Sequence, residues 1–195
     1  MPEDPTLLPL HLINHEIPLK NPNLRIVHRP AKCPEPLREE FREKFDCYVK
    51  AGWWVHMTLP STAPLLIMFK KSRAIRMVID TRQRHENTIL DVTPLPDQEA
   101  VRNDVACANF HMKIDLSDAF EQICVQPEHE AHTVFATIYG NMYSRTMQQG
   151  DKNCPVTFQR LMNSTFADMI GIFIHCYQDD IFIYLNMLEE HKEHL

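Results

Sequence analysis

The sequence predicts an α+β fold, from the order of its apolar patterns and from its composition. A helical pattern and strands come first, and a βαβ-type segment that ends in a hairpin follows. The length of 195 residues suits one large domain or two small lobes. A hydrophobic content of 44% and a charged content of 24% are those of an ordinary soluble globular protein.

The first part of the chain is expected to hold an arm, a helix and two strands. Ten of the fourteen prolines lie in the first 64 residues, so residues 1–36 should form an extended arm with little regular structure. From Leu37, apolar residues at helical spacing predict a helix, which Gly52 can cap. Alternating or continuous apolar residues at 64–69 and 75–80 predict two strands.

The rest of the chain predicts a second set of elements. The evidence is strand alternation, a glycine turn and one long amphipathic pattern. The expected elements are a short helix over 97–104, a strand over 110–116, a short helix around Phe120, a hairpin of 133–139 with 142–147 that turns at Gly140-Asn141, a helix from Pro155 to Gly171, and a hairpin within 173–184.

Charge is unevenly distributed along the chain. The net charge of −6 counts against a nucleic-acid binder, which usually carries a basic excess. Residues 70–85, however, hold six basic side chains and a single acid, Asp80. A basic strip on an acidic body can still hold phosphates. The basic strip consists of Lys70, Lys71, Arg73, Arg76, Arg82 and Arg84.

The cysteines and histidines form no complete metal motif. The six cysteines are scattered without a CxxC pair, so we expect reduced thiols in an intracellular protein that is not secreted. We expect neither a signal peptide nor a membrane span, because no basic leader is present and no apolar run approaches ~18 residues. His11 and His15, like His191 and His194, have metal-ligand spacing but no third ligand, so we expect solvated surface histidines.

The most informative feature is the pair Asp179-Asp180, which lies between two apolar runs of strand length. Gln178-Asp179 falls where a tight hairpin turns, and a turn that exposes both carboxylates concentrates negative charge that a cation relieves. Carboxylate oxygens suit Mg²⁺, and two Mg²⁺ ions about 3.5–4 Å apart are the usual device for in-line phosphoryl transfer. Asp115 can supply a third carboxylate from a strand beside the hairpin. Aspartate also favours turns for conformational reasons alone, and for the pair by itself this alternative stays open.

Four motifs stand in order along the chain. They are Arg76-Met-Val-Ile-Asp80-Thr-Arg82, Lys113-Ile-Asp115-Leu-Ser-Asp-Ala-Phe120-Glu-Gln122-Ile, Gln149-Gly150 through Pro155-Val-Thr-Phe158-Gln159-Arg-Leu-Met, and Tyr177-Gln-Asp179-Asp180-Ile. Together they resemble the reverse transcriptase domain of gypsy-class LTR retrotransposons and retroviruses. The likeness runs from about residue 36 to residue 195, and the ordered set is far more specific than any single motif.

The resemblance implies the fingers and palm subdomains of a right-hand polymerase and an RNA-directed DNA polymerase activity. The fingers would comprise 37–89 and 123–153, and the palm 90–122 and 154–195. The implied substrates are deoxynucleoside triphosphates and an RNA or DNA template with a primer. The implied cofactor is a pair of Mg²⁺ ions, which Mn²⁺ could replace, and no membrane is involved.

The resemblance also implies roles for single residues. The catalytic and metal-binding residues would be Asp115, Asp179 and Asp180, and the nucleotide-binding residues would be Lys70, Lys71, Arg76, Phe120, Gln149 and Gly150. Phosphoryl transfer depends mainly on positioning and charge neutralisation, which carboxylate-bound metals and fixed cations provide. An aromatic ring where the 2′-hydroxyl of a ribonucleotide would lie excludes that sugar by a steric clash.

Three departures from the family pattern are present. Gln178 stands where the family usually has an apolar residue. The hairpin at 71–75 is short and lacks a Gly or Asp tip, which leaves Lys70 and Lys71 as alternatives for one role. The sequence stops eleven residues after Tyr184, before the primer-gripping hairpin, thumb and RNase H domain of the family, so we expect a truncated domain or one part of a retroelement polyprotein. The alternative function is a catalytically inactive remnant that acts as a binding protein.

Overall fold

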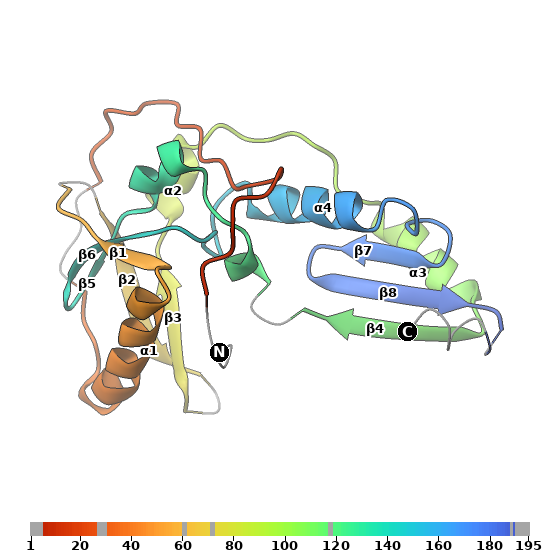
Figure 1. Cartoon of the computed structure of the whole chain (residues 1–195), viewed down its shortest axis with the longest axis horizontal. Coiled ribbons are helices and arrows are strands. Elements are labelled where there is room, and N and C mark those ends of the chain that lie inside the picture. The colour runs from red at the N-terminus through yellow and green to blue at the C-terminus, as the bar shows by residue number, and fades with distance from the viewer. Residues whose placement is uncertain are drawn as a thin grey trace. The chain divides into compact units, whose positions relative to one another are not determined.

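The chain folds into two compact units (Figure 1). The computed structural model describes residues 6–26, 31–59, 62–70, 73–116, 119–187 and 189. Unit 1 comprises Met1–Leu90 and Phe120–Cys154, and unit 2 comprises Asp91–Ala119 and Pro155–Leu195. The boundaries between the two units fall after residues 90, 119 and 154, whereas the prediction placed them after residues 89, 122 and 153. The observed boundaries therefore lie within three residues of the predicted ones. The assignment of the two units to fingers and palm stays a prediction.

Among the described residues of unit 1, five strands form one sheet with the order β1-β6-β5-β2-β3. β2 pairs antiparallel with β3 and parallel with β5. The strands are β1 (Trp54–His56), β2 (Ala63–Phe69), β3 (Ile75–Ile79), β5 (Phe135–Thr137) and β6 (Gly140–Ser144). The helices are η1 (Glu35–Leu37), α1 (Arg38–Lys50), α2 (Arg82–Asn87), η2 (Phe120–Gln122) and η3 (Pro127–Thr133). The predicted helix after Leu37 and the two strands that follow it are therefore confirmed.

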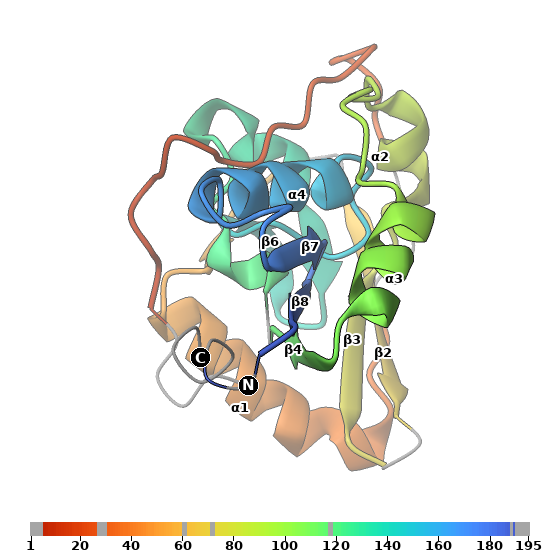
Figure 2. The same cartoon turned by 90° about the vertical axis from the view of Figure 1, so that its right-hand side faces the viewer.

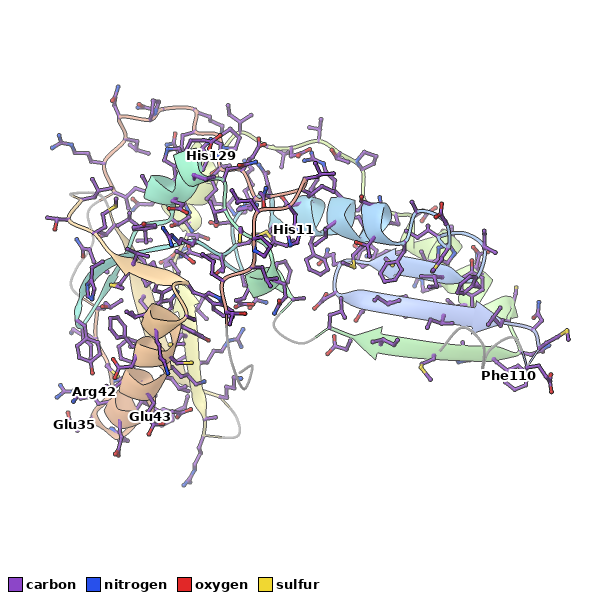
Figure 3. The ribbon with its side chains drawn as sticks, in the orientation of Figure 1. His11, Glu35, Arg42, Glu43, Phe110 and His129 are labelled. Carbon is purple, nitrogen blue, oxygen red and sulfur yellow. The ribbon has the colours of Figure 1, made fainter. Side chains whose placement is uncertain are left out.

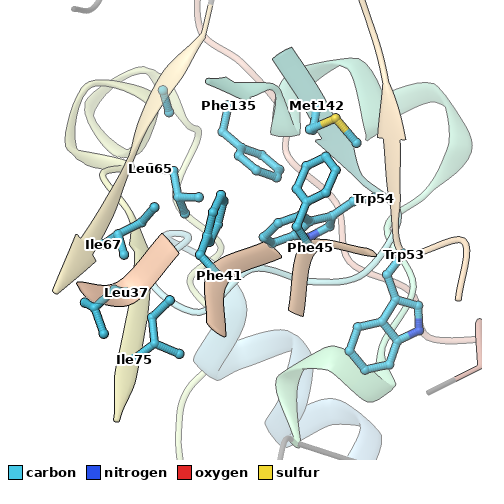
Figure 4. Close-up of a cluster of buried hydrophobic side chains, with 11 residues drawn as sticks. Leu37, Phe41, Phe45, Trp53, Trp54, Leu65, Ile67, Ile75, Phe135 and Met142 are labelled. Carbon is cyan, nitrogen blue, oxygen red and sulfur yellow. The ribbon is translucent and has the colours of Figure 1, made fainter. Parts of the chain in front are cut away.

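The core of unit 1 forms where α1 packs its apolar side on this sheet (Figure 4). Phe41 and Phe45, one turn apart on α1, are both buried. Phe45 meets Trp54 edge-on with ring centroids 6.1 Å apart, and Trp54 in turn meets Phe135 of β5 at 4.8 Å. Truncating one of these rings to alanine would cost about 3–5 kcal/mol. Arg42, which Figure 3 shows pointing away from this core, has a side chain that is 74% exposed.

The N-terminal arm of unit 1 contains isolated bridges but no helix or strand within residues 6–26 and 31–34. His15 lies in one of these bridges, and its N–H donates to the Cys124 carbonyl over 2.8 Å. The expectation that His15 is solvated is wrong, because this bridge carries the imidazole inside unit 1, where it is 0% exposed. His11, labelled in Figure 3, is exposed. His191 and His194 lie outside the described residues.

The hairpin of β5 and β6 is present, but it turns two residues earlier than predicted. Thr137 pairs with Gly140, so Ile138 and Tyr139 form the turn in place of Gly140-Asn141. Gly140 has a φ of 115° and begins β6. A glycine with positive φ directly after a tight turn is a common hairpin solution, because it lets the second strand resume its register. The Thr137 hydroxyl closes this turn by donating to the Gly140 carbonyl over 2.7 Å.

Among the described residues of unit 2, three antiparallel strands form a sheet with the order β4-β8-β7. The strands are β4 (Phe110–Asp115), β7 (Ile174–Tyr177) and β8 (Asp180–Leu185), and the helices are α3 (Gln98–Cys107) and α4 (Cys154–Thr165), which starts at the last residue of unit 1. The Asp97 carboxylate caps α3 by accepting from the Glu99 N–H over 2.9 Å. Figures 1 and 2 both show α4 beside β7.

α4 is shorter than its apolar pattern predicts. It ends at Thr165 and not at Gly171, and turns follow it. Phe158 and Met162 within α4 are buried, whereas Met169 beyond its end is 40% exposed. The last three residues of α4 are Asn, Ser and Thr, whose side chains compete for backbone hydrogen bonds and therefore weaken a helix.

Two properties of the whole chain complete the fold. All six cysteines are free thiols, as predicted. Cys124, Cys154 and Cys176 are buried, and Cys107 is exposed. Within the part of the chain that the structure describes, no helix has the length and apolar composition needed to cross a membrane.

Candidate active site

The two adjacent carboxylates lie at the hairpin between β7 and β8, as the sequence predicts. Tyr177 pairs with Asp180, which leaves Gln178 and Asp179 as the two turn residues. Gln178 has a φ of 54°. A positive φ costs a residue with a Cβ about 1–2 kcal/mol, but it gives a two-residue turn the twist that its strands need. Asp179 therefore lies in the turn, and Asp180 begins β8.

β4 brings a third carboxylate to this hairpin. Asp115 is the register partner of Asp180. Facing residues of an antiparallel pair project from the same side of the sheet, with Cβ atoms about 4.5–5.5 Å apart. The Leu116 N–H also donates to the Asp179 carbonyl over 3.1 Å, which joins the turn to the end of β4. The three predicted catalytic carboxylates therefore lie together at one end of the sheet of unit 2.

Lys113 belongs to this group, although no role was predicted for it. Its Nζ lies 2.8 Å from Asp180 Oδ2. The hydrogen bond to Asp180, together with the charges of all three carboxylates, raises the pKa of Lys113. One ammonium group is thus attracted by Asp115, Asp179 and Asp180 at once. The sequence signal for this contact is that Lys113 stands two residues before Asp115, and so on the same face of β4.

Gln159 of α4 braces the hairpin and was also given no role. Its side chain is buried, with 2% exposed. Nε2 donates to the Cys176 carbonyl over 2.9 Å, and Oε1 accepts from the Gln178 N–H over 2.9 Å. β7 is an edge strand of this sheet, so its outward backbone groups need partners that β8 does not supply. In the sequence, a glutamine beside the apolar stripe of a helix is the signal for a side chain that can bond to the backbone of an edge strand.

Unit 1 holds a second group of predicted residues. Arg76, Gln149 and Gly150 line one cavity of about 340 Å³. Arg76 lies on β3 and is exposed. Gly150 has a φ of 103°, and its carbonyl accepts from the Thr81 hydroxyl over 2.8 Å. A guanidinium group and a backbone without a side chain beside one cavity suit a ligand that carries phosphates.

The remaining predicted nucleotide-binding residues lie as follows. Lys70 is exposed after β2, where its N–H donates to the Ala74 carbonyl over 2.7 Å. Phe120 is half-buried at the start of η2, in unit 1. Lys71 lies outside the described residues. The structure thus brings Arg76, Gln149 and Gly150 together in unit 1, and the carboxylates in unit 2.

The basic strip is smaller than the sequence suggests. Arg84 is 4% exposed, and its Nε donates to Asp151 Oδ1 over 2.8 Å while Nη2 donates to Gln148 Oε1 over 2.6 Å. The expectation that Arg84 faces a phosphate is therefore wrong, because this guanidinium neutralises a buried carboxylate. Arg82 is exposed but forms an ion pair of 2.6 Å with Asp80. Its hydrogen bond to that carboxylate raises the pKa of Arg82.

Comparison with known proteins places the chain in a family. Residues 65–195 match the family described as "Reverse transcriptase (RNA-dependent DNA polymerase)". The chain belongs to the reverse transcriptase family. Among similar reverse transcriptase sequences is an "RNA-directed DNA polymerase homolog" of Oenothera berteroana, which is 32% identical over 125 residues, or 63% of this chain and 88% of that protein.

Transposon proteins and viral structures are also similar to this reverse transcriptase chain. The "Retrovirus-related Pol polyprotein from transposon opus" of Drosophila melanogaster is 28% identical over 167 residues, which are 83% of this chain and 17% of that polyprotein. The chain also spans only 13% of the polyprotein of transposon 297. A foamy viral protease-reverse transcriptase in complex with double-stranded DNA superposes with a TM-score of 0.79 at 19% identity, covering 95% of this chain and 32% of the viral one. The fold is that of the fingers and palm of a reverse transcriptase.

Proposed function

We propose that the chain is the fingers-and-palm part of an RNA-directed DNA polymerase from a gypsy-class LTR retrotransposon. The observation that carries this proposal is the convergence of Asp115, Asp179 and Asp180 at one end of the β4-β8-β7 sheet. The substrates would be deoxynucleoside triphosphates and a primed RNA or DNA template. The protein would act inside the cell. It would be part of a longer polyprotein, and this second point is supported by the small share of the transposon polyproteins that the chain spans.

The carboxylate group fits a pair of divalent cations. Asp115, Asp179 and Asp180 offer only oxygen ligands, which Mg²⁺ and Mn²⁺ accept. The contact of the Lys113 ammonium with Asp180 indicates that the carboxylates attract positive charge. When bound there, Mg²⁺ would supply charge neutralisation at the phosphates and a more acidic primer hydroxyl.

The protein's own residues would position the reacting groups. The ladder between β4 and β8 fixes the spacing of Asp115 and Asp180, and Gln159 fixes the turn that carries Asp179. Phosphoryl transfer depends largely on such positioning.

The residues of unit 1 would recognise the nucleotide. The Arg76 guanidinium, with Lys70 or Lys71, would bind phosphate oxygens, and Gly150, next to Gln149, would allow the nucleotide to approach the backbone. The ring of Phe120 would exclude a ribose.

Primer extension on an RNA template with Mg²⁺ tests the proposal. The unchanged chain should extend the primer, and Asp179→Asn should abolish extension because one metal ligand loses its charge. The matched control is Asp104→Asn, which alters an exposed carboxylate of α3 that bonds only to His175 in the described contacts. If the folded chain, supplied with a reverse transcriptase thumb by fusion, binds template–primer but extends nothing, the non-catalytic alternative is favoured.

A further inference from the structure

Three side chains of different metal-binding chemistry meet inside unit 1. They are His15 of the N-terminal arm, Asp151 of the turn before α4 and Cys154, the first residue of α4, and one ligand atom from each lies within 4.8 Å of the other two. His15 Nε2 lies 3.8 Å from Asp151 Oδ2 and 3.8 Å from Cys154 Sγ. The three residues are 0%, 5% and 1% exposed, respectively. All three belong to unit 1, whereas the catalytic carboxylates belong to unit 2.

Backbone hydrogen bonds hold these side chains in place from both sides. On the arm, the His15 N–H donates to the Cys124 carbonyl over 2.8 Å, and the His15 carbonyl accepts from the Gln126 N–H over 2.9 Å. At the start of α4, the Cys154 N–H donates to the Asp151 carbonyl of the preceding turn over 3.3 Å. Ligand atoms that the backbone already fixes lose little freedom on binding an ion.

One oxygen of this group points to a missing partner. Asp151 Oδ1 accepts from the Arg84 guanidinium, but Asp151 Oδ2 is buried and has no hydrogen-bond partner in the described part of the chain. A buried carboxylate oxygen without a partner costs free energy, so some group is expected there.

We propose that His15, Asp151 and Cys154 bind a zinc ion that fastens the N-terminal arm to the turn before α4. A set of one nitrogen, one oxygen and one sulfur ligand suits Zn²⁺ and not Mg²⁺, which takes oxygen ligands. Zinc–ligand bonds of about 2.0–2.3 Å in a tetrahedron place ligand atoms roughly 3.3–3.8 Å apart, so the observed separations need only small shifts.

Zinc binding at this site displaces one proton. Zn²⁺ replaces the proton that the Cys154 thiol now shares with the Gln148 carbonyl over 3.1 Å, and that proton passes to solvent. The thiolate and the Asp151 carboxylate then offset the dication. The Arg84 guanidinium, which contacts the other oxygen of Asp151, opposes a second cation, so we expect weaker binding than at a site of four protein ligands. These three side chains leave one tetrahedral position for water or another ligand.

Cobalt substitution tests the site, because Co²⁺ takes zinc-like ligand sets and reports them by colour. Titrating the folded chain with Co²⁺ should produce sulfur-to-cobalt charge-transfer absorption and visible bands typical of tetrahedral cobalt, which Zn²⁺ then removes. Native mass spectrometry should find one zinc ion per chain. Cys154→Ala should abolish the charge-transfer band, whereas the control Cys124→Ala should keep it, since Cys124 is also a buried thiol of unit 1 but donates to the Leu8 carbonyl.

Hydrogen exchange provides a readout of the fastening role. Zn²⁺ should slow exchange of the Gln126 amide, whose acceptor is the His15 carbonyl, and His15→Ala should remove this effect. The cobalt spectrum of the wild-type protein tests the proposed zinc site even if a variant fails to fold. No cobalt–sulfur band in the folded wild type, or a band that Cys154→Ala retains, overturns the proposal. None of these measurements uses polymerase activity, so their failure is distinct from failure of the proposed function.

Discussion

Replacing Gln159 with leucine should loosen the hairpin that carries Asp179 and Asp180. Leucine is similar in size but has no polar atom, so the Cys176 carbonyl and the Gln178 N–H both lose their partner. A buried backbone group without a hydrogen bond costs about 1–3 kcal/mol, and two groups would cost about 2–6 kcal/mol. Because Gln178 is only half-buried, water can reach its N–H after the change, so we expect about 2–3 kcal/mol.

Hydrogen exchange of peptides from β7 and β8 measures this loss directly. Both tryptophans, Trp53 and Trp54, lie in unit 1, so their fluorescence would not follow unit 2. A loss of about 2–3 kcal/mol predicts about 30- to 150-fold faster exchange in the hairpin, since 1.36 kcal/mol is a factor of ten. Primer extension should fall with it, because the carboxylates would be less firmly positioned.

Two further substitutions control this experiment. Gln159→Glu keeps the acceptor for the Gln178 N–H but loses the donor to the Cys176 carbonyl, so exchange should lie between the wild type and the leucine variant. Asn163→Ala removes an exposed side chain that accepts from the same Nε2, and should change stability by less than about 0.5 kcal/mol. Exchange that stays as slow in the leucine variant as in the wild type would refute the bracing role of Gln159.

Three other changes should have measurable effects. Mg²⁺ should raise the melting temperature of the wild type but not of Asp179→Asn. Lys113→Ala should lower the melting temperature in chelator and enlarge the shift that Mg²⁺ produces, because that ammonium no longer offsets the carboxylates. Equal shifts in all three proteins would contradict the metal site. Phe120→Val should raise ribonucleotide relative to deoxynucleotide incorporation in single-nucleotide extension, and an unchanged ratio in an active variant would remove Phe120 from the sugar site. Burial raises the pKa of Cys176 from 9.0 to about 11, so unfolding releases a proton in this range and the stability of unit 2 should fall as pH rises from 9 to about 11. In urea titrations, Cys176→Ala should lessen that fall, and the same fall in both proteins would argue against this thiol as its source.

The carboxylate group was predictable because it depends on short-range rules. Strand alternation places Asp115 on the polar face of β4, and a two-residue turn places Asp179 and Asp180 at its end. The hairpin and its neighbouring strand follow from local pattern, and an antiparallel pairing then brings the three side chains together.

Other features could not be predicted from the sequence because they depend on contacts with residues far away along the chain. Nothing near Arg84 indicates that it is buried, since its partner Asp151 lies 67 residues further along the chain. His15 likewise lies in a proline-rich arm whose local pattern predicts exposure, and a bridge to Val125 buries it. The turn at Ile138-Tyr139 was misplaced for a local reason, because a glycine serves equally well within a turn and directly after one.

The division of the chain also sets an order for its folding during synthesis. β4 has no partner until β8, whose first residue lies 65 positions after Asp115, has left the ribosome. All of unit 1 precedes Pro155 in the sequence, so it can fold while the strands that complete the sheet of unit 2 are still being made. Once Phe120–Cys154 is folded, fewer than half of the intervening residues remain flexible, and each halving of a loop lowers its closure cost by roughly 0.6 kcal/mol. The carboxylate group should therefore assemble last, on a chain in which Arg76, Gln149 and Gly150 of unit 1 are already in place.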